Sequence, residues 1–108
     1  MKDTATLLQD MLDAITTIDS YAIASHEEFL KDKKTQDAVM YNLLLIGEAA
    51  HKVPREFQEM HPEIPWSSFI GTKNVILHGD DPVKLQIVWD IILEKLYPFK
   101  MTLYQLIR

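Results

Sequence analysis

Three neighbouring residues, Lys73, Asn74 and His78, carry the side chains best suited to chemistry in this sequence. Cleavage of a phosphodiester without a metal needs a base that takes a proton from the attacking hydroxyl, and fixed cations or amides that hold charge on the phosphoryl oxygens. Asn74 and His78 would share one helical face, whereas Lys73 lies farther around and must reach back with its flexible stem. Spacing alone leaves a plainer interpretation open, in which Lys73 and Asn74 are solvated and His78 is favoured near a helix C-terminus.

The other polar residues offer fewer indications of a site. His26, His51 and His61 have no ligand-type partner at a helical spacing, and the sequence contains no cysteine. We therefore expect surface or loop histidines, no metal and no cofactor. Glu48 is unusual within an apolar segment, and it is either a buried, paired acid near the site or the polar edge of a helix.

The apolar spacing along the chain is typical of helices, and no segment favours a strand. The expected helices cover residues 3–21, a short stretch from Ser25, a central segment from Thr35 or Gln36 to Ala50, a short turn from Pro54 to Met60, a segment from Trp66 or Ser67 to His78, and a last segment from Asp81 that kinks or breaks at Pro98.

Local signals at the ends of these helices support the assignment. Ser25 and Glu28 have the spacing of a capping box. Gly79 can end the helix that carries His78, because glycine tolerates the left-handed conformation. The periodicity also places Leu30 and Leu93 on inward faces.

Length and composition indicate one globular domain, residues 1–108, with 47% hydrophobic and 25% charged residues. Four or five helices joined by short loops predict an all-α antiparallel bundle. The sequence shows no signal peptide and no membrane-spanning run, so we expect a cytoplasmic protein. The net charge of −5 argues against a broad basic surface, and any nucleic-acid site must therefore be local.

The segment 70–79, with the sequence IGTKNVILHG, resembles the signature helix of HEPN domains, specifically the HepT-like ribonuclease toxins. The motif of that family is an arginine, an asparagine and, a few residues on, a histidine. Further landmarks appear in family order at residues 37–39, 42–43, 46–50, 62–66 and 88–90.

The resemblance implies a HEPN-like helical bundle that dimerises about a two-fold axis and cuts RNA without a metal in a cleft shared by both copies. It also implies a partner, an MntA-like nucleotidyltransferase that acts as the antitoxin. In this chain His78 matches the catalytic histidine and Asn74 the asparagine. Lys73 replaces the arginine and lacks its planar fork. Asp80 stands where adenylylated members carry a tyrosine.

Two functions follow from this resemblance. The first is a metal-independent endoribonuclease toxin of a toxin–antitoxin pair, with Lys73, Asn74 and His78 as the catalytic residues. The second is a catalytically weakened HEPN dimer that serves as the binding partner of a small nucleotidyltransferase, which the departures at Lys73 and Asp80 favour.

Overall fold

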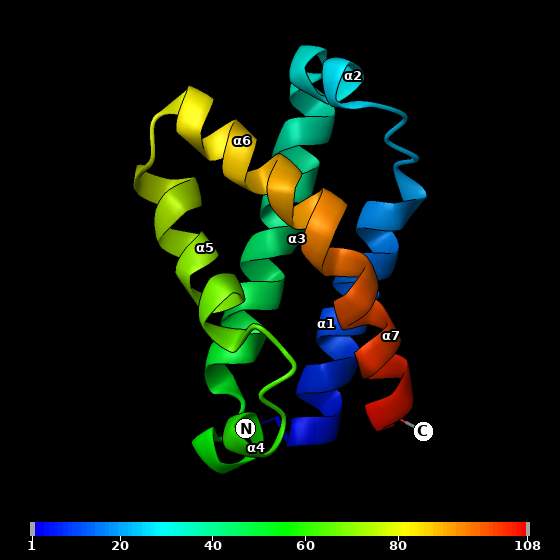
Figure 1. Cartoon of the computed structure of the whole chain (residues 1–108), viewed down its shortest axis with the longest axis vertical. Helices are drawn as coiled ribbons and strands as arrows, with labels where there is room; N and C mark the ends of the chain where they lie inside the picture. Colours follow the sequence, from blue (N-terminus) through cyan, green and yellow to red (C-terminus); the bar gives the residue numbers. More distant parts are fainter. Residues whose placement is uncertain (1, 108) are drawn as a thin grey trace.

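Residues 2–107, which the computed structural model describes, form four long helical segments and two short helices (Figure 1). The elements are α1 (Thr4–Ser20), α2 (His26–Lys31), α3 (Lys33–Lys52), α4 (Arg55–Met60), α5 (Trp66–His78), α6 (Asp81–Asp90), the π-helix η1 (Ile91–Lys95) and α7 (Leu96–Ile107). These described residues include no strand, and the expected all-α fold is confirmed.

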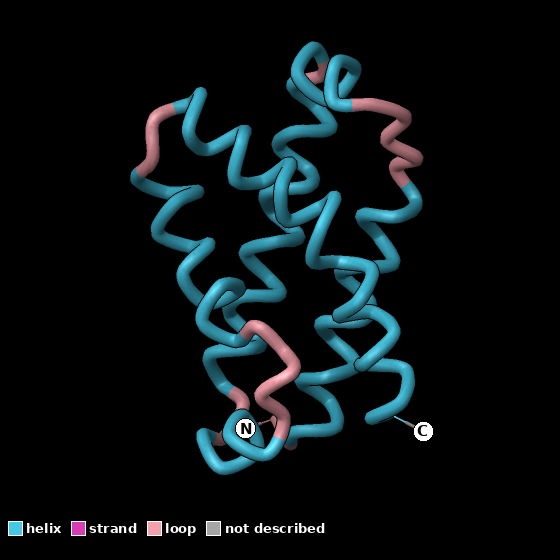
Figure 2. Tube along the Cα trace, viewed as in Figure 1, coloured by secondary structure: helices cyan, strands magenta, loops and turns pink. Residues whose placement is uncertain are grey.

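The long segments run alternately up and down, joined by short connections (Figure 2). α3 is the central helix, with α1 and α5 packed against it and α7 packed against α1. Their inward side chains form one apolar core in a molecule of 39 × 27 × 24 Å. Within residues 2–107, no helix has both the length and the apolar character needed to cross a membrane.

Side-chain caps fix where several helices begin. The Ser25 hydroxyl accepts a hydrogen bond from the Glu28 amide at 3.1 Å, as the capping box predicts. α3 begins earlier than expected, at Lys33. Asp32 accepts a hydrogen bond from the Thr35 amide at 3.2 Å and so caps the N-terminus of this helix. Hydrogen bonds from the side chain and the amide of Thr35 also lower the pKa of Asp32 below its ordinary value.

Of the two alternatives expected at Pro98, a kink or a break, the break is wrong. Helix continues from α6 to α7, and the irregularity is the π-helix η1 just before the proline. Pro98 has no N–H to donate to the Glu94 carbonyl, and its ring crowds that carbonyl. A wider π turn relieves both problems and rotates the side chains that follow.

The expected burial of Leu30 and Leu93 is wrong. Leu30 is 47% exposed, because the short helix α2 reaches the core through Phe29 instead. Leu93 is 63% exposed, since the π turn breaks the regular period on which its inward placement depended.

Gly79 ends α5 as expected, but for a different reason. Its φ is −77°, so it is not left-handed. A Cβ at this position would lie 2.6 Å from the Val75 carbonyl oxygen, the same atom that accepts the Gly79 amide at 2.8 Å. Glycine is therefore needed at this position because there is no space for a Cβ atom.

Gly47 sets the distance between the two central helices. A Cβ at Gly47 would lie 2.6 Å from the backbone carbonyl oxygen of Phe69 on α5, which is closer than real contacts allow. The backbones of α3 and α5 therefore touch at this point. By contrast, a Cβ at Gly71, on the exposed side of α5, would meet nothing within 4 Å.

These two helical glycines predict opposite effects of the same substitution. We expect Gly47→Ala to lower the free energy of unfolding by about 1–2 kcal/mol, because overpacking outweighs the better helix propensity of alanine. We expect Gly71→Ala to raise it by about 0.5–1 kcal/mol. Urea denaturation followed by circular dichroism measures both, and equal effects at the two positions would contradict the close contact.

Candidate functional site

The inner face of α5 is fixed firmly in the core. Trp66, Phe69, Thr72 and Ile76 are buried along this face. The Trp66 indole donates a hydrogen bond to the His61 carbonyl at 3.0 Å. The Phe69 ring stacks on Phe99 of α7 with centroids 4.6 Å apart. These contacts set the rotation of α5 about its axis and thereby decide which side chains face outward.

Asn74 and His78 lie on the outward face of α5, and both are exposed. Four residues correspond to about 400° of helix, so the two side chains are separated by only about 40° around the axis. Gly71, also exposed, falls in the same row. We call Gly71, Asn74 and His78 the α5 row. The structure thus brings together two of the three residues that the sequence predicted as catalytic.

Lys73 is held apart from this row. Its ammonium lies 3.9 Å from the carboxylate of Glu48 on α3, and Lys52 lies 3.5 Å from the other oxygen of the same carboxylate. Lys73 is about 140° around the helix from His78. Because all three side chains in this ion-pair cluster are about half exposed, solvent screens them and they hold one another only weakly.

Glu48 combines parts of the two roles that the sequence left open. It is neither fully buried nor merely a polar edge, since its half-exposed carboxylate pairs with a lysine on each of two helices. The pairing with Lys73 was not predicted. The only signal in the sequence was an acid inside an otherwise apolar stretch of α3.

Asp80 has a structural role that the sequence analysis missed. Its carboxylate accepts a hydrogen bond from the Val83 amide at 3.1 Å and caps α6. The sequence signal was the proline at position 82, near the start of a helix that needs a cap. Asp80 is therefore held in place at the turn that follows His78.

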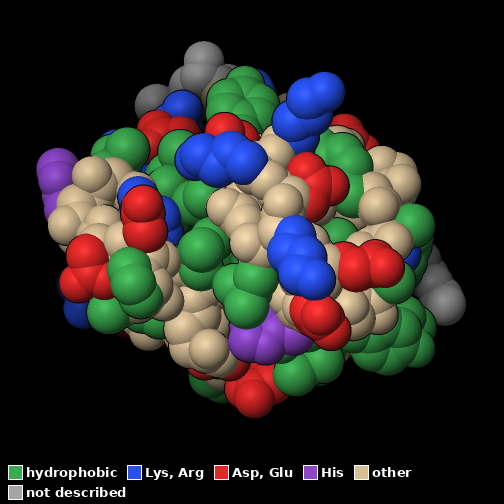
Figure 3. Space-filling view, turned by 90° about the horizontal axis from the view of Figure 1, so that it is seen from above, with side chains coloured by type: hydrophobic (Ala, Val, Ile, Leu, Met, Phe, Trp, Pro, Cys, Tyr) green, Lys and Arg blue, Asp and Glu red, His purple; other side chains and the backbone are tan. Residues whose placement is uncertain are grey.

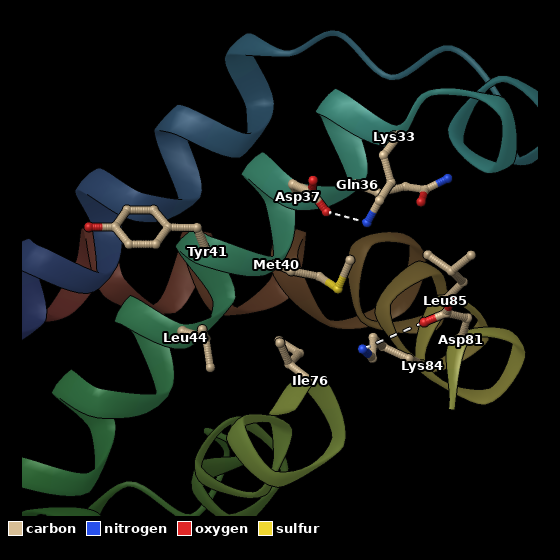
Figure 4. A pocket seen from close by; sticks show the side chains of 10 residues that line it. All are labelled: Lys33, Gln36, Asp37, Met40, Tyr41, Leu44, Ile76, Asp81, Lys84 and Leu85. Atoms are coloured by element: carbon tan, nitrogen blue, oxygen red, sulfur yellow. Dashed lines mark hydrogen bonds and ion pairs between the residues drawn. The ribbon is translucent and has the colours of Figure 1, made fainter. Parts of the chain in front are cut away.

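A cavity of about 320 Å³ lies between α3, the end of α5 and the start of α6 (Figure 4). Both of its lysines are paired, Lys33 with Asp37 at 2.8 Å and Lys84 with Asp81 at 3.7 Å. Ile76, which lines the cavity from α5, points about 160° away from His78. The cavity therefore does not extend the α5 row.

The charge around the site is mixed. Figure 3 shows the end of the bundle where the turn between α5 and α6 lies, and on this face basic and acidic side chains are interspersed with hydrophobic ones. This pattern agrees with the net charge of −5. Any attraction for a phosphate must therefore come from individual side chains.

Two of the histidines outside α5 have contacts of their own. His26 stacks on Trp89 with centroids 4.9 Å apart, and His61 lies 3.3 Å from Glu63. Within residues 2–107, no group of three or more His, Asp or Glu side chains could hold a metal ion.

Comparisons with known proteins agree with this architecture. The family described as Ribonuclease HepT-like matches residues 11–106. A putative RNase of Methanocaldococcus jannaschii is 35% identical over 95 residues, which cover 87% of this chain and 78% of that protein. A probable ribonuclease HepT of Thermococcus cleftensis is 35% identical over 94 residues, 86% of each chain. No solved structure matches significantly. The chain belongs to the HepT-like ribonuclease family.

Proposed function

We propose that this protein is a metal-independent endoribonuclease toxin that cuts RNA in a cleft formed by two copies of the chain. The observation that carries the proposal is the α5 row, in which an exposed imidazole and an exposed amide lie one helical turn apart on the same face of α5. His78 would take the proton from the RNA 2′-hydroxyl as its oxygen attacks the neighbouring phosphorus. The bond from phosphorus to the 5′-oxygen would break, and that oxygen would leave with a proton from water, which gives a 2′,3′-cyclic phosphate and a 5′-hydroxyl. Asn74 would donate hydrogen bonds to the phosphoryl oxygens.

A second copy would supply what one α5 lacks. In a single chain Lys73 points toward Glu48 and not toward His78. Two α5 helices facing each other across a two-fold axis would place two sets of these side chains around one phosphate. Exposed Tyr41 and Leu45 on α3 and Leu77 on α5 offer an apolar area for such an interface.

The proposed partner of this dimer is an MntA-like nucleotidyltransferase antitoxin. Its regulation would differ from the tyrosine-based switch, because Asp80 cannot accept adenylylation as a tyrosine does. A second function, a weakened dimer that mainly binds the transferase, is favoured by one observation: the cation of Lys73 is already engaged by Glu48. Measured RNA cleavage separates the two functions.

The first test of the enzyme is His78→Ala. Because His78 is exposed and general acid–base catalysis contributes about 10²–10⁴-fold, we expect at least about a 100-fold loss of cleavage with little change in the melting temperature. Single-turnover assays on a labelled RNA in excess chelator measure the rate.

His51→Ala is the matched control for this variant, since His51 is also exposed and lies in the last turn of a helix. It should retain full activity. An all-deoxy version of the substrate should stay intact, because it lacks the attacking hydroxyl. Activity that needs a divalent metal, or that survives in His78→Ala, would refute the proposed mechanism.

Lys73→Arg tests whether the lysine limits activity. A guanidinium can hold two phosphoryl oxygens through parallel hydrogen bonds, and such charge-assisted bonds contribute about 1.5–3 kcal/mol, so we expect roughly a tenfold or larger rise in rate. Lys52→Arg is the control, because Lys52 pairs with the same Glu48 carboxylate. Equal effects of the two variants would show that the pairing with Glu48 is responsible, and no rise in Lys73→Arg would favour the binding-partner function.

Asp80→Asn separates charge from capping at the turn after His78. Asparagine also caps helices, so α6 should remain intact while a negative charge that repels RNA is removed. We expect cleavage to rise a few fold at low salt and less at high salt. Asp32→Asn, the same change at the cap of α3, should leave the rate unchanged. An unchanged or lower rate in Asp80→Asn would mean that the carboxylate does not oppose RNA binding.

A further inference from the structure

One row of large apolar side chains remains exposed on η1 and α7. Leu93 is 63% exposed, Tyr97 69%, and Met101 and Tyr104 each 44%. Their spacing of four, four and three residues aligns them along one side of the helix. We call these four residues the α7 stripe. An apolar patch of several hundred Å² often marks an interaction surface.

The α7 stripe is separate from the α5 row. α7 packs through Phe99 and Leu103 on the core and lies against α1, which leaves the stripe on its outer side. The α5 row belongs to a different helix that packs on α3 (Figure 1). A partner that covers the stripe therefore need not touch Asn74 or His78.

We propose that the α7 stripe is a self-association surface, through which two copies of this chain pair antiparallel about a two-fold axis. The spacing of the four residues in the α7 stripe is nearly the same from either end. If Tyr97 lies opposite Met101 of the partner copy, then Leu93 lies within one residue of the partner copy's Tyr104. Each apolar side chain thus meets another, as an isologous interface requires. Tyr and Met are also enriched at protein interfaces.

The exposed area suits such a pairing. With about 150–250 Å² for an aromatic side chain, the exposed parts of Tyr97 and Tyr104 come to roughly 220 Å². Leu93 and Met101 bring the total to on the order of 400 Å² per copy. A standard interface buries about 800 Å² per partner, of which about 57% is apolar, or roughly 450 Å². The stripe therefore supplies most of the apolar part of a standard interface.

A small cavity beside the stripe offers a place for a partner side chain. It measures about 220 Å³ and lies between α1 and α7, with Tyr97 and Lys100 on its wall. In the antiparallel arrangement, Met101 of the partner copy lies over Tyr97 at the mouth of this cavity. Methionine is flexible enough to fill an irregular gap of this kind. By two-fold symmetry, each copy would place its Met101 in the cavity of the other copy.

The charge next to the stripe does not oppose self-pairing. Lys100 lies near the centre of the arrangement, where the lysines of both copies approach each other. Its ammonium donates a hydrogen bond to Asp19 of its own chain at 2.6 Å, so each copy carries its own counter-charge. The same hydrogen bond raises the pKa of Lys100 above its ordinary value.

Cysteine cross-linking tests the antiparallel register directly, because the chain has no cysteine of its own. Leu93→Cys chains mixed with Tyr104→Cys chains should form a disulfide-linked heterodimer under mild oxidation. Neither variant alone should cross-link, since the two copies of residue 93 would be about 18 Å apart along the helices and the two copies of residue 104 about 15 Å, whereas a disulfide needs Cα atoms within about 7 Å. Cross-linking in either variant alone, or none in the mixture, would overturn the proposal.

Sedimentation equilibrium of full-length protein tests the surface without cross-linking. We expect Tyr97→Lys and Met101→Lys each to halve the mass of the assembly. RNA cleavage per chain should stay unchanged, because the proposed interface at the α5 row remains. Met60→Lys, which changes a 71% exposed methionine on α4, is the matched control and should keep the wild-type mass. A monomeric wild type, or an unchanged mass in both stripe variants, would overturn the proposal. Loss of cleavage in His78→Ala with intact assembly would show that the two surfaces act independently.

Discussion

The contact between α3 and α5 at Gly47 is the constraint on which the site depends. Backbone approach this close removes the layer of side chains that usually separates two helices, so α5 has little freedom to slide or rotate. Phe69 then stacks on Phe99, and Ile76 is buried in the core. With the inner face fixed in this way, Asn74 and His78 face outward because of their positions along the helix. Their geometry needs no loop to hold it.

The same constraint explains why one chain supplies only part of the proposed phosphate site. A rigid helix cannot turn Lys73 and His78 to the same side, because their spacing separates them by about 140°. Lys73 instead finds a carboxylate on the neighbouring helix, at a distance that indicates a loose ion pair. A flexible lysine can leave that loose, half-exposed pair to contact a phosphate, whereas the α5 row stays where the core holds it.

The sequence predicted the helices well, and with them the shared helical face of Asn74 and His78, because both depend on local periodicity. It failed where the backbone departs from regular helix geometry and where side chains on two helices meet. Leu93 was predicted to face inward, but the π turn η1, which lies just before Pro98, changes the helical period at this residue. Gly79 was assigned a left-handed conformation, although its role is to leave room for a carbonyl oxygen. The pairing of Glu48 with Lys73 also lay beyond local rules, since it joins residues on two helices.

The α5 row and the α7 stripe differ in the physics that each can use. The row has small and polar side chains, so it gains little from burial and is suited to a charged substrate that comes and goes. The stripe has large apolar side chains, whose removal from water favours lasting association. Because the two lie on different helices, a substitution in the stripe can alter assembly without moving the imidazole of His78. Separation of this kind allows association strength and catalytic geometry to change independently in one small bundle.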